Sequence, residues 1–306
     1  MIGIKQVTVH RGQDSVDTFA VAENLSVSAD FIREKIGMER LSRKGKNEDA
    51  SDLAVSAARP LFEEHGLSPE DVDCLVLVTQ NPDDAGLPHT SAVIHQKLGL
   101  RKNCAVFDIS LGCSGYVQGL AVIKSLMEGQ GFRNGLLVTA DPYSKIVDMS
   151  DRDTALIFGD GATATWMSEA PVWRLGACDF GIDSASREAL KISDSGQLTM
   201  NGRSVFNFAA TEVPKSISRV LEEAHTSIGE IDLVLLHQGS KFIVETIAQR
   251  IGAEGKTPFV AAHYGNTISS SIPMILAEEV SGNASKLLLS GFGVGLAWAT
   301  CFLERV

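Results

Sequence analysis

The sequence lacks long hydrophobic runs and a secretion signal. Its longest apolar runs, at 74–78 and 286–292, fall far short of the roughly 20 residues that a membrane-spanning helix needs. The N-terminal residues do not show the basic stretch followed by an apolar stretch that is typical of a signal peptide. We therefore expect a cytoplasmic protein without membrane contact.

Cysteine is scarce, and no two cysteines form a recognisable pair in the sequence. The five cysteines, at 74, 104, 113, 178 and 301, form no CxxC motif and indicate neither a disulfide framework nor a zinc knuckle. His89 and His95 have a spacing that does not place them on one face of a helix, so they do not indicate a zinc site. We expect no bound metal, and we expect most of the cysteines to be buried, inert thiols.

Positive charge is also in short supply. The 27 Lys and Arg residues are outnumbered by 38 Asp and Glu residues, which gives a net charge of −11. A protein that binds nucleic acid needs a positive field over at least one face, so we expect no nucleic-acid partner. The same net charge disfavours an acidic protein partner at long range.

What the sequence does contain is a regular alternation of short β-rich runs and longer helical patterns, typical of an α/β protein with buried sheets. Its 306 residues, 44% of them hydrophobic, are enough for a large core. The predicted strands are 73–80, 104–110, 135–141, 232–238, 257–262 and 286–292. The predicted helices include 49–66, 117–129 and 213–225.

Three of these elements recur after about half the chain. The strand that begins at Asp73 matches the one that begins at Asp232, the turn at Gly112–Cys113 matches the turn at Gly265–Asn266, and "LLVTA" from 136 matches "LLLSG" from 287. Internal repetition in the same order predicts two similar α/β halves. We expect these halves to span 1–168 and 169–306.

The duplication suggests which polar residues meet. If the halves pack around a pseudo-twofold axis, the matching loops bring Cys113, His237 and Asn266 together. His237 ends a predicted strand, where α/β proteins commonly place their chemistry, although a histidine there also fits a purely structural role.

Cys113 stands between two glycines at the predicted start of a helix. Unpaired N–H groups and the helix dipole favour an anion at this position, and the thiolate is the nucleophilic form of cysteine. Gly112 and Gly115 permit a sharp turn and leave room for a substrate carbonyl. The alternative is that a small residue simply fits a tight turn.

Six motifs together resemble one enzyme family. They are "DISLGCSGYVQGL", "DRDTALIFGDGATA", "MNGRSVFNFA", "LLHQ", "HYGNTISSSIP" and "GFGVGLAW". In order and spacing they resemble β-ketoacyl-(acyl-carrier-protein) synthase III, a condensing enzyme of the thiolase superfamily. The resemblance covers essentially the whole chain and implies a thiolase-like fold with an α-β-α-β-α layered core and a homodimer.

The resemblance also implies a role for each central residue. Cys113 would take an acyl group from a coenzyme A or carrier-protein thioester. His237 and Asn266 would hold the carbonyl of a malonyl-type thioester while it loses carbon dioxide and attacks the acyl group. The loop of Gly293, Val294 and Gly295 would supply an N–H to the oxyanion, beside that of Cys113. No metal or redox cofactor is implied.

Several positions depart from the family pattern on the donor side. Phe31 stands where the family stacks a tryptophan on the adenine of coenzyme A, and Lys35 stands where it has an arginine. Phe242 replaces an arginine that meets the donor's phosphates or the carrier, with Lys241 beside it as a possible substitute. Arg152 is retained.

Other departures concern the pocket walls. Gly239 and Ser240 replace an alanine and an asparagine of the histidine loop, and Val294 replaces a glycine. Leu87 stands where an aromatic side chain closes the acyl tunnel of the family. The motif at Met200, Asn201 and Gly202 completes the expected substrate-binding set. Together these differences indicate a specialised fatty-acid, polyketide or other secondary-metabolite enzyme.

Docking of an acidic acyl carrier needs a local basic patch that dominates within a Debye length of about 8–10 Å. Candidate members of such a patch are Lys215, Lys241, Arg250 and Lys256. An ordinary surface of mixed charge is the equal alternative.

Two other functions compete with condensation. One is an acyltransferase that passes the acyl group of Cys113 to an amine or hydroxyl, with His237 as general base and no release of carbon dioxide. The other is an inactive partner of a catalytic homologue, which the presence of all three central residues disfavours. A papain-like hydrolase is disfavoured by the order of its catalytic residues and by the duplicated halves.

Overall fold

The strands form one large sheet made of two groups. The computed structural model describes residues 1–280 and 282–306. One group has the order β5–β4–β6–β7–β1 and the other β8–β13–β12–β11, and the two join where β1 pairs with β8. The strands of this sheet are β1 (Gly3–Arg11), β4 (Cys74–Val78), β5 (Ala105–Ile109), β6 (Asn134–Ala140), β7 (Gly161–Ser168), β8 (Trp173–Ile182), β11 (Leu233–Leu236), β12 (Lys286–Gly293) and β13 (Ala297–Arg305). Two small hairpins pair β2 (Asp14–Asp17) with β3 (Arg40–Arg43) and β9 (Leu190–Ile192) with β10 (Leu198–Met200).

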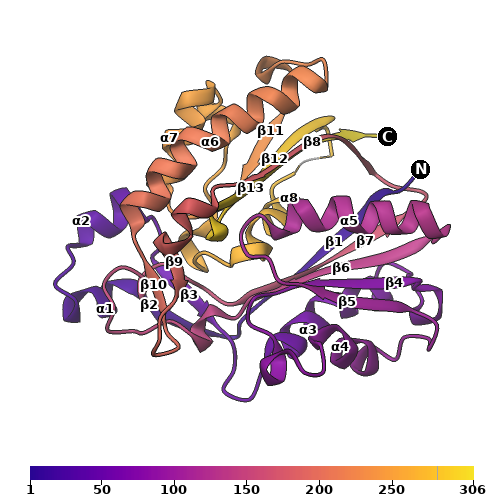
Figure 1. Ribbon diagram of the computed structural model, residues 1–306, viewed down its shortest axis with the longest axis horizontal. Helices are drawn as coiled ribbons and strands as arrows, with labels where there is room; N and C mark the ends of the chain where they lie inside the picture. Colours follow the sequence, from indigo (N-terminus) through magenta and orange to yellow (C-terminus); the bar gives the residue numbers. More distant parts are fainter. Residues whose placement is uncertain (281) are drawn as a thin grey trace.

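Helices separate and cover the two groups of strands. In the middle layer, α5 contacts β4 and β6 on one side and β12 and β13 on the other, and α8 likewise contacts strands of both groups. Helices α3 and α4 cover the outer face of the first group, and α6 covers that of the second beside α7 (Figure 1). This arrangement confirms the predicted α-β-α-β-α order. The helices are α1 (Thr18–Asn24), α2 (Ala29–Phe31), α3 (Ala50–Glu63), α4 (Thr90–Leu98), α5 (Gly115–Gln130), α6 (Gly202–Glu223), α7 (Lys241–Ile251) and α8 (Ser271–Glu278).

The two groups repeat one topology. The series β4–α5–β6–β7 corresponds to β11–α8–β12–β13, and each series places its strands in the same order. Asp73 accepts hydrogen bonds from the backbone N–H of Arg133 and Asn134, at the start of β6. Asp232 accepts equivalent bonds from Ser285 and Lys286, at the start of β12. The boundary between 1–168 and 169–306, which lies between β7 and β8, stays a prediction.

The strand predicted at 257–262 is wrong. This segment would correspond to β5, but the side chain of Gln238 occupies its backbone groups: Gln238 Nε2 donates to the carbonyl of Pro258, and its Oε1 accepts from the N–H of Val260. A side chain therefore replaces the neighbouring strand as hydrogen-bond partner. None of the described helices is long and apolar enough to cross a membrane.

The helix predicted at 213–225 begins earlier than the sequence pattern indicates. It starts at Gly202, where the side chain of Asn201 caps it by accepting a hydrogen bond from the N–H of Ser204. Pro214 lies inside the helix and did not mark its start. The extra turns place the "MNGRSVFNFA" motif at the beginning of α6.

Candidate active site

Cys113 lies in the short turn between β5 and α5, at the junction of the two halves. Its side chain is only 5% exposed. The loop after β12 approaches it so closely that a Cβ built on Gly293 would lie 2.6 Å from Cys113 Sγ. A Cβ on Gly291 would lie 2.5 Å from the carbonyl oxygen of Cys113. Glycine is therefore required at 293 because any side chain there would strike the thiol.

The backbone N–H groups of Val294 and Cys113 lie close enough to this sulfur to lower the pKa of the thiol. These are the two N–H groups that the family resemblance implies as donors to the oxyanion. Val294 is not among the residues with positive φ, and Gly295 takes that conformation with a φ of 132°. Valine at 294 is therefore compatible with the backbone of the loop.

The prediction that the helix start favours the Cys113 thiolate is wrong for the resting structure. Burial raises the pKa of the thiol to about 12, because desolvation outweighs the two N–H groups that would stabilise the anion, and nearby Asp141 raises it further. The thiol is protonated at neutral pH. Its proton must leave when an acyl donor arrives.

His237 and Asn266 lie side by side, both buried. Asn266 Nδ2 is 3.3 Å from His237 Nε2, and His237 Nδ1 is 2.8 Å from the hydroxyl of Ser271. The Ser271 hydroxyl donates to the carbonyl of Ile268, and that carbonyl also faces the imidazole, so the resting tautomer carries its proton on Nδ1. Burial lowers the pKa of His237 to about 3, which keeps the ring neutral.

The amide of Asn266 is oriented by the backbone two residues further along the chain. Its Oδ1 accepts a hydrogen bond of 2.9 Å from the N–H of Ile268, which leaves Nδ2 facing His237. The first half holds this loop in place: Asn266 N donates to the carbonyl of Ile157, and Gly159 N donates to the carbonyl of Asn266. The two halves are thus bonded together at the site itself.

The segment 158–162, between the Asn266 loop and β7, is held by a buried carboxylate. Asp160 is fully buried, and its carboxylate accepts hydrogen bonds from the N–H groups of Lys44 and Ser144 and from the Ser144 hydroxyl. It ties together three segments at the start of β7, beside the Phe158–Gly159 backbone that pairs with Asn266. A carboxylate with this many partners is a structural anchor.

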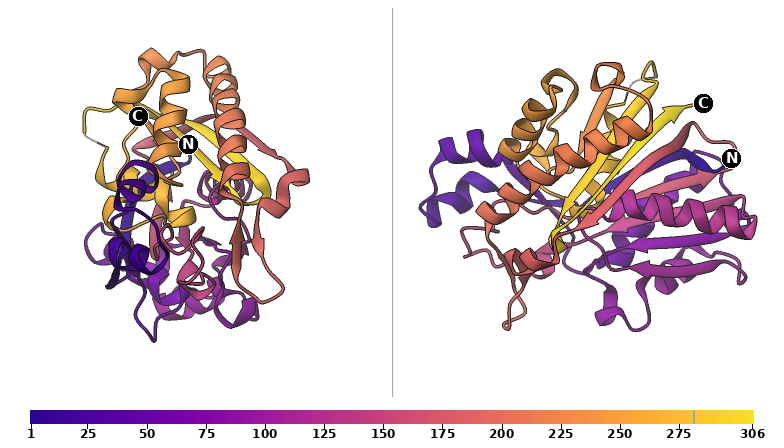
Figure 2. Two further views of the ribbon diagram at one scale, coloured as in Figure 1. Left: turned by 90° about the vertical axis from the view of Figure 1, so that its left-hand side faces the viewer. Right: turned by 45° about the horizontal axis from the view of Figure 1, so that its top comes forward.

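A cavity of about 600 Å³ opens onto all three central residues. Cys113, His237 and Asn266 lie on its wall, together with nine of the other residues that the sequence singles out. These nine are Phe31, Lys35, Arg152, Met200, Gly202, Gly239, Ser240, Phe242 and Gly293. The segment that carries Phe31 and Lys35 reaches the cavity because it packs on α7 of the second half (Figures 1 and 2).

Five predicted residues do not line this cavity. Val294 and Gly295 line a second one, and Asn201 caps α6. Lys241 faces the carbonyl of Arg33 and the carboxylate of Glu245. Leu87 is 86% exposed and points away from the body of the protein.

The mouth of the first cavity is aromatic and basic. The ring of Phe242 stacks on Phe206 with centroids 5.2 Å apart, and Lys35 Nζ lies 3.9 Å from the Phe242 centroid. Arg152 and Arg203 also line the cavity, with Asp153 as an acidic neighbour. Arg203 and Phe206 belong to the "MNGRSVFNFA" motif but were not predicted as site residues.

A second cavity of about 490 Å³ lies on the other side of the Cys113 turn. Leu190 lines both cavities, and the hydroxyl of Tyr143 donates to Gln80 Oε1 at 2.9 Å in the second. A Cβ on Gly112 would lie 2.5 Å from the same Gln80 oxygen, so the Gln80 side chain touches the nucleophile turn. Tyr143 and Gln80 are site residues that the sequence analysis missed.

Asp141 is a second buried acid near the site, and it was not predicted from the sequence. Its carboxyl group accepts from the N–H of Gln80 at 2.7 Å and from the hydroxyl of Ser269, three residues after Asn266. Burial raises its pKa to about 6. Its position at the end of the predicted strand 135–141 was the available signal, because ligands and polar groups gather at the carboxyl ends of strands.

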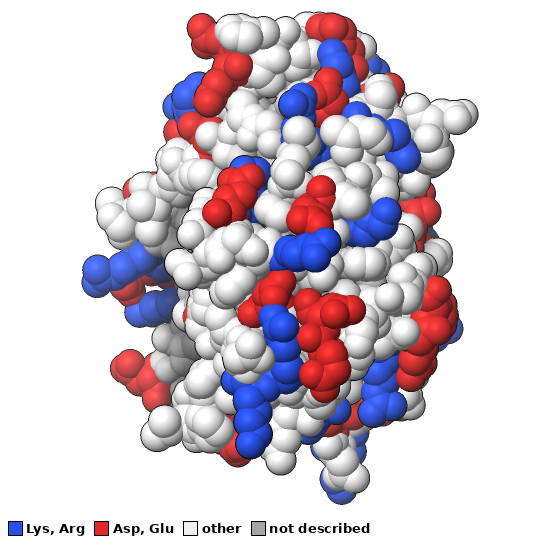
Figure 3. Space-filling view, turned by 90° about the vertical axis from the view of Figure 1, so that its right-hand side faces the viewer, with Lys and Arg blue, Asp and Glu red and all other residues white. Residues whose placement is uncertain are grey.

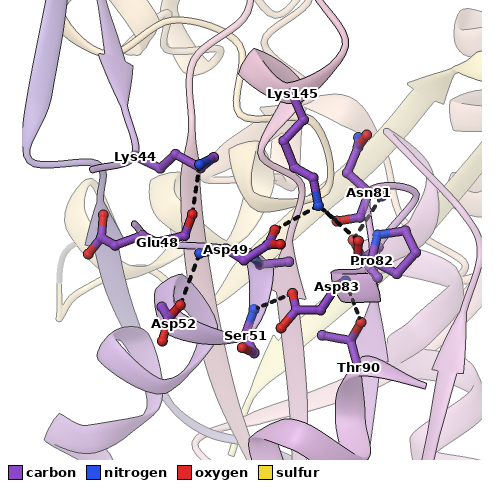
Figure 4. Close-up of polar contacts among 12 residues, drawn as sticks. Lys44, Glu48, Asp49, Ser51, Asp52, Asn81, Pro82, Asp83, Thr90 and Lys145 are labelled. Atoms are coloured by element: carbon purple, nitrogen blue, oxygen red, sulfur yellow. Dashed lines mark hydrogen bonds and ion pairs between the residues drawn. The ribbon is translucent and has the colours of Figure 1, made fainter. Parts of the chain in front are cut away.

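A polar network holds the loop that precedes Leu87 (Figure 4). Lys145 Nζ contacts the carboxylate of Asp49 at 2.7 Å and the carbonyl of Pro82 at 2.8 Å. Asp83 accepts from the N–H of Ser51 and donates its own N–H to the Thr90 hydroxyl. The loop that leads to the exposed Leu87 is therefore held in place by several hydrogen bonds.

The four lysine and arginine residues proposed as a carrier patch are largely engaged within the molecule. Lys256 Nζ donates to the carbonyls of Ile228, Gly229 and Ile231, and Arg250 donates to the carbonyl of Ala210. Lys215 pairs with Glu212. Figure 3 shows, on one further face of the molecule, acidic and basic side chains interleaved, without a large patch of one sign.

Within residues 1–280 and 282–306, no group of three or more His, Cys, Asp and Glu side chains is placed to hold a metal ion.

Comparison with known proteins identifies the family. Models of 3-oxoacyl-(acyl-carrier-protein) synthase III match residues 107–184, and models of its C-terminal part match residues 221–305. The chain is 33% identical to beta-ketoacyl-(acyl-carrier-protein) synthase III 1 of Halalkalibacterium halodurans, over 99% of this chain and 98% of that protein. The chain belongs to the 3-oxoacyl-(acyl-carrier-protein) synthase III family. The thiolase fold and the condensing-enzyme class implied by the sequence resemblance are confirmed.

Solved structures agree with this assignment. The crystal structure of the Aquifex aeolicus synthase III superposes with a TM-score of 0.93 and 27% identity, covering 100% of both chains. The priming β-ketosynthase from the R1128 polyketide pathway superposes with a TM-score of 0.90 and 25% identity, covering 100% of this chain and 96% of that one. The family member described here thus shares its whole fold with enzymes of both kinds.

Proposed function

We propose that this synthase III family member transfers an acyl group from a thioester to Cys113 and condenses it with a malonyl-type thioester, releasing carbon dioxide. The observation that carries the proposal is the convergence of Cys113, His237 and Asn266 on one cavity of about 600 Å³. The product is a β-ketoacyl thioester. The reaction requires no redox or metal cofactor.

The first step is acyl transfer to the thiol. Cys113 Sγ attacks the donor carbonyl, and the sulfur of the donor leaves. The leaving sulfur takes up the proton that Cys113 gives up. The N–H groups of Val294 and Cys113 stabilise the oxyanion of the tetrahedral intermediate. Because the thiol pKa is about 12, this step depends on substrate-assisted loss of the proton rather than on a standing thiolate.

The second step needs two hydrogen-bond donors for the enolate oxygen of the malonyl thioester. Asn266 Nδ2 is one of them. His237 Nε2 becomes the other in the second tautomer of the ring: Nδ1 gives its proton to water, Nε2 takes one up from water in the cavity, and the Ser271 hydroxyl turns away from Ile268 to donate to Nδ1. That rotation gives up one hydrogen bond, at a cost of about 1 kcal/mol.

The cavity mouth supports a phosphate-bearing thioester, either coenzyme A or the phosphopantetheine arm of a carrier protein. Lys35, Arg152 and Arg203 supply positive charge, and Phe31, Phe206 and Phe242 supply apolar and aromatic surface. The protein would meet an acidic carrier through this mouth rather than through the four residues proposed from sequence. We further propose a cytoplasmic homodimer that pairs through the free edge of β5, whose residues are all partly exposed.

One observation favours a second function. In the resting tautomer His237 Nε2 carries no proton, so it is able to act as a general base toward an amine or hydroxyl acceptor. Such an acyltransferase would use Cys113 in the same way but would release no carbon dioxide.

Measurement of carbon dioxide separates the two functions. The purified protein, first acylated by an acyl-CoA, is given malonyl-CoA labelled in its free carboxyl group. We expect labelled carbon dioxide and a β-ketoacyl thioester in equal amounts, and both formed about 10²–10³-fold more slowly with Asn266→Ala. Acyl transfer to an amine or hydroxyl without labelled carbon dioxide would overturn condensation in favour of the second function.

A further inference from the structure

Two cysteines outside the active site face one another across the sheet. Cys178 in β8 and Cys301 in β13 are directly opposite in the antiparallel ladder, and their sulfur atoms are 3.0 Å apart. Opposite residues of such a ladder have Cα atoms roughly 4.5–5.5 Å apart, which falls within the range that a disulfide spans. Both thiols are reduced in this structure, and the backbone already holds them in bonding position.

The two thiols are not equivalent. Cys301 is fully buried in the core beneath α5, whereas Cys178 is partly exposed. The hydrogen bond between them lowers the pKa of Cys178 and raises that of Cys301. Lys124 of α5 favours the anion, and Glu223 opposes it. A partly exposed thiol of lowered pKa beside a buried partner is the arrangement of an attacking and a resolving cysteine.

We propose that Cys178 and Cys301 form a reversible oxidation site that is closed by a peroxide and opened by a dithiol. The Cys178 thiolate attacks one oxygen of hydrogen peroxide and becomes a sulfenic acid, while the other oxygen leaves and is protonated to water. Cys301 then attacks that sulfur, gives up its proton and displaces a second water as the disulfide forms. In sum, two thiols and one peroxide give one disulfide and two waters.

The disulfide would link strands that carry the catalytic loop. β13 follows directly after residues 293–295, and β8 leads to Asp183, whose backbone exchanges two hydrogen bonds with Leu296 at 2.8 and 3.3 Å. Oxidation therefore adds a covalent link between the two strands that support the Val294 N–H. No sequence pattern indicates this pair, because the two cysteines are far apart along the chain and meet only through the strand register.

The test is peptide mapping of the full-length protein in a Cys113→Ala background, so that the nucleophile does not react. After treatment with dilute hydrogen peroxide and blocking of free thiols with iodoacetamide, we expect a peptide pair that joins 178 to 301. The intact mass should fall by two hydrogen atoms per chain and should return with dithiothreitol. Because acyl transfer is not measured, failure here leaves the proposed function untouched.

Matched variants define the result. Cys178→Ser and Cys301→Ser should each abolish the linked peptide, while Cys104→Ser, which changes another partly exposed thiol, should retain it. If either serine variant fails to fold, the presence or absence of the linked 178–301 peptide in the Cys113→Ala protein tests the proposal by itself. Iodoacetamide-labelled Cys178 and Cys301 after peroxide treatment, or sulfinic acid on Cys178 without a link to Cys301, would overturn the proposal.

Discussion

Asn266 directs its side-chain amide at the imidazole of His237, with Nδ2 3.3 Å from Nε2, although the two residues come from separate loops of the second half. The backbone of Ile268 fixes the orientation of the amide, and Ser271 fixes that of the imidazole. In a condensation these groups act on the extender thioester, while Cys113 and the N–H of Val294 act on the acyl donor. The two steps should therefore respond to different mutations.

Asn266→Ala should impair condensation and spare acylation. Removal of one donor to a developing enolate typically lowers kcat by about 10²–10³. We expect a loss of this size in β-ketoacyl product, with a rate of Cys113 acylation close to that of the parent protein. Single-turnover acylation and steady-state product formation measure the two separately. Equal losses in both would contradict the division of labour.

Ser271→Ala should slow condensation by about 10–100-fold, the usual effect of removing a group that orients a catalytic side chain. The hydroxyl is needed because it supports both tautomers of His237. Ser271→Thr keeps the hydroxyl and should retain most of the activity, which distinguishes a lost hydrogen bond from a disturbed fold. The loss should appear in kcat and leave the KM for the acyl donor nearly unchanged.

His237 should not titrate in the activity profile between about pH 5 and 8, because its folded pKa is about 3. Because the pKa of His237 is lowered in the folded protein, the unfolded chain takes up a proton on this residue at a higher pH than the folded chain does. The free energy of unfolding therefore falls as the pH drops from about 6.5 toward 3. Between these two pH values the free energy of unfolding should fall by up to about 5 kcal/mol. His237→Gln, which has no titratable group, should flatten that part of the unfolding curve; an unchanged curve would contradict the burial of a neutral ring.

Asp141 should act on stability in the opposite direction. Its folded pKa of about 6 lies above the ordinary value of 3.8, so the folded protein holds the proton more tightly and loses stability as the pH rises from about 4 to 6. The effect is about 3 kcal/mol and is fully developed above pH 6. Asp141→Asn should remove this dependence while its Oδ1 keeps the bond from Gln80 N. Chemical unfolding at pH 4 and pH 7 compares the two proteins, and an equal pH dependence in both would contradict the raised pKa.

Gly293→Ala should abolish acylation of Cys113 without unfolding the protein. The added Cβ would fall 2.6 Å from the thiol, a distance that the loop is able to relieve only by moving Val294 and its N–H. Gly255→Ala is the matched control, because a Cβ there meets no atom within 4 Å. Acyl-enzyme formation in the first variant at the rate of the control would show that the close approach has no catalytic role.

Local pattern and internal repetition predicted an α/β protein of two similar halves in which Cys113, His237 and Asn266 meet, and the family resemblance implied the thiolase-like fold and the role of each residue. Cys113 and Asn266 occupy equivalent turns of the two halves, and His237 ends a strand, so topology alone brings them together. The same reasoning missed Tyr143, Phe206 and Asp141, whose places near the site depend on how separate segments pack. Such packing leaves no periodic signal in the sequence.

The incorrect predictions have the same origin. The start of α5 suggests a stabilised thiolate at Cys113, but burial by surrounding segments raises the pKa instead. The apolar run at 257–262 suggests a strand, but the side chain of Gln238, from another segment, takes its hydrogen bonds. The sequence suggests that Lys256 belongs to a basic surface patch, but its ammonium group donates hydrogen bonds to three backbone carbonyls. In each case a partner distant in sequence decides the outcome.

The most direct test of the central claim is the intact mass of the purified protein after incubation with a panel of acyl-CoA and acyl-carrier donors. At least one donor should add the mass of a single acyl group, peptide mapping should place it on Cys113, and Cys113→Ala should take up none. If no donor adds an acyl mass, or if the mass remains in Cys113→Ala, Cys113 is not the acyl acceptor and the mechanism proposed for this family member is wrong.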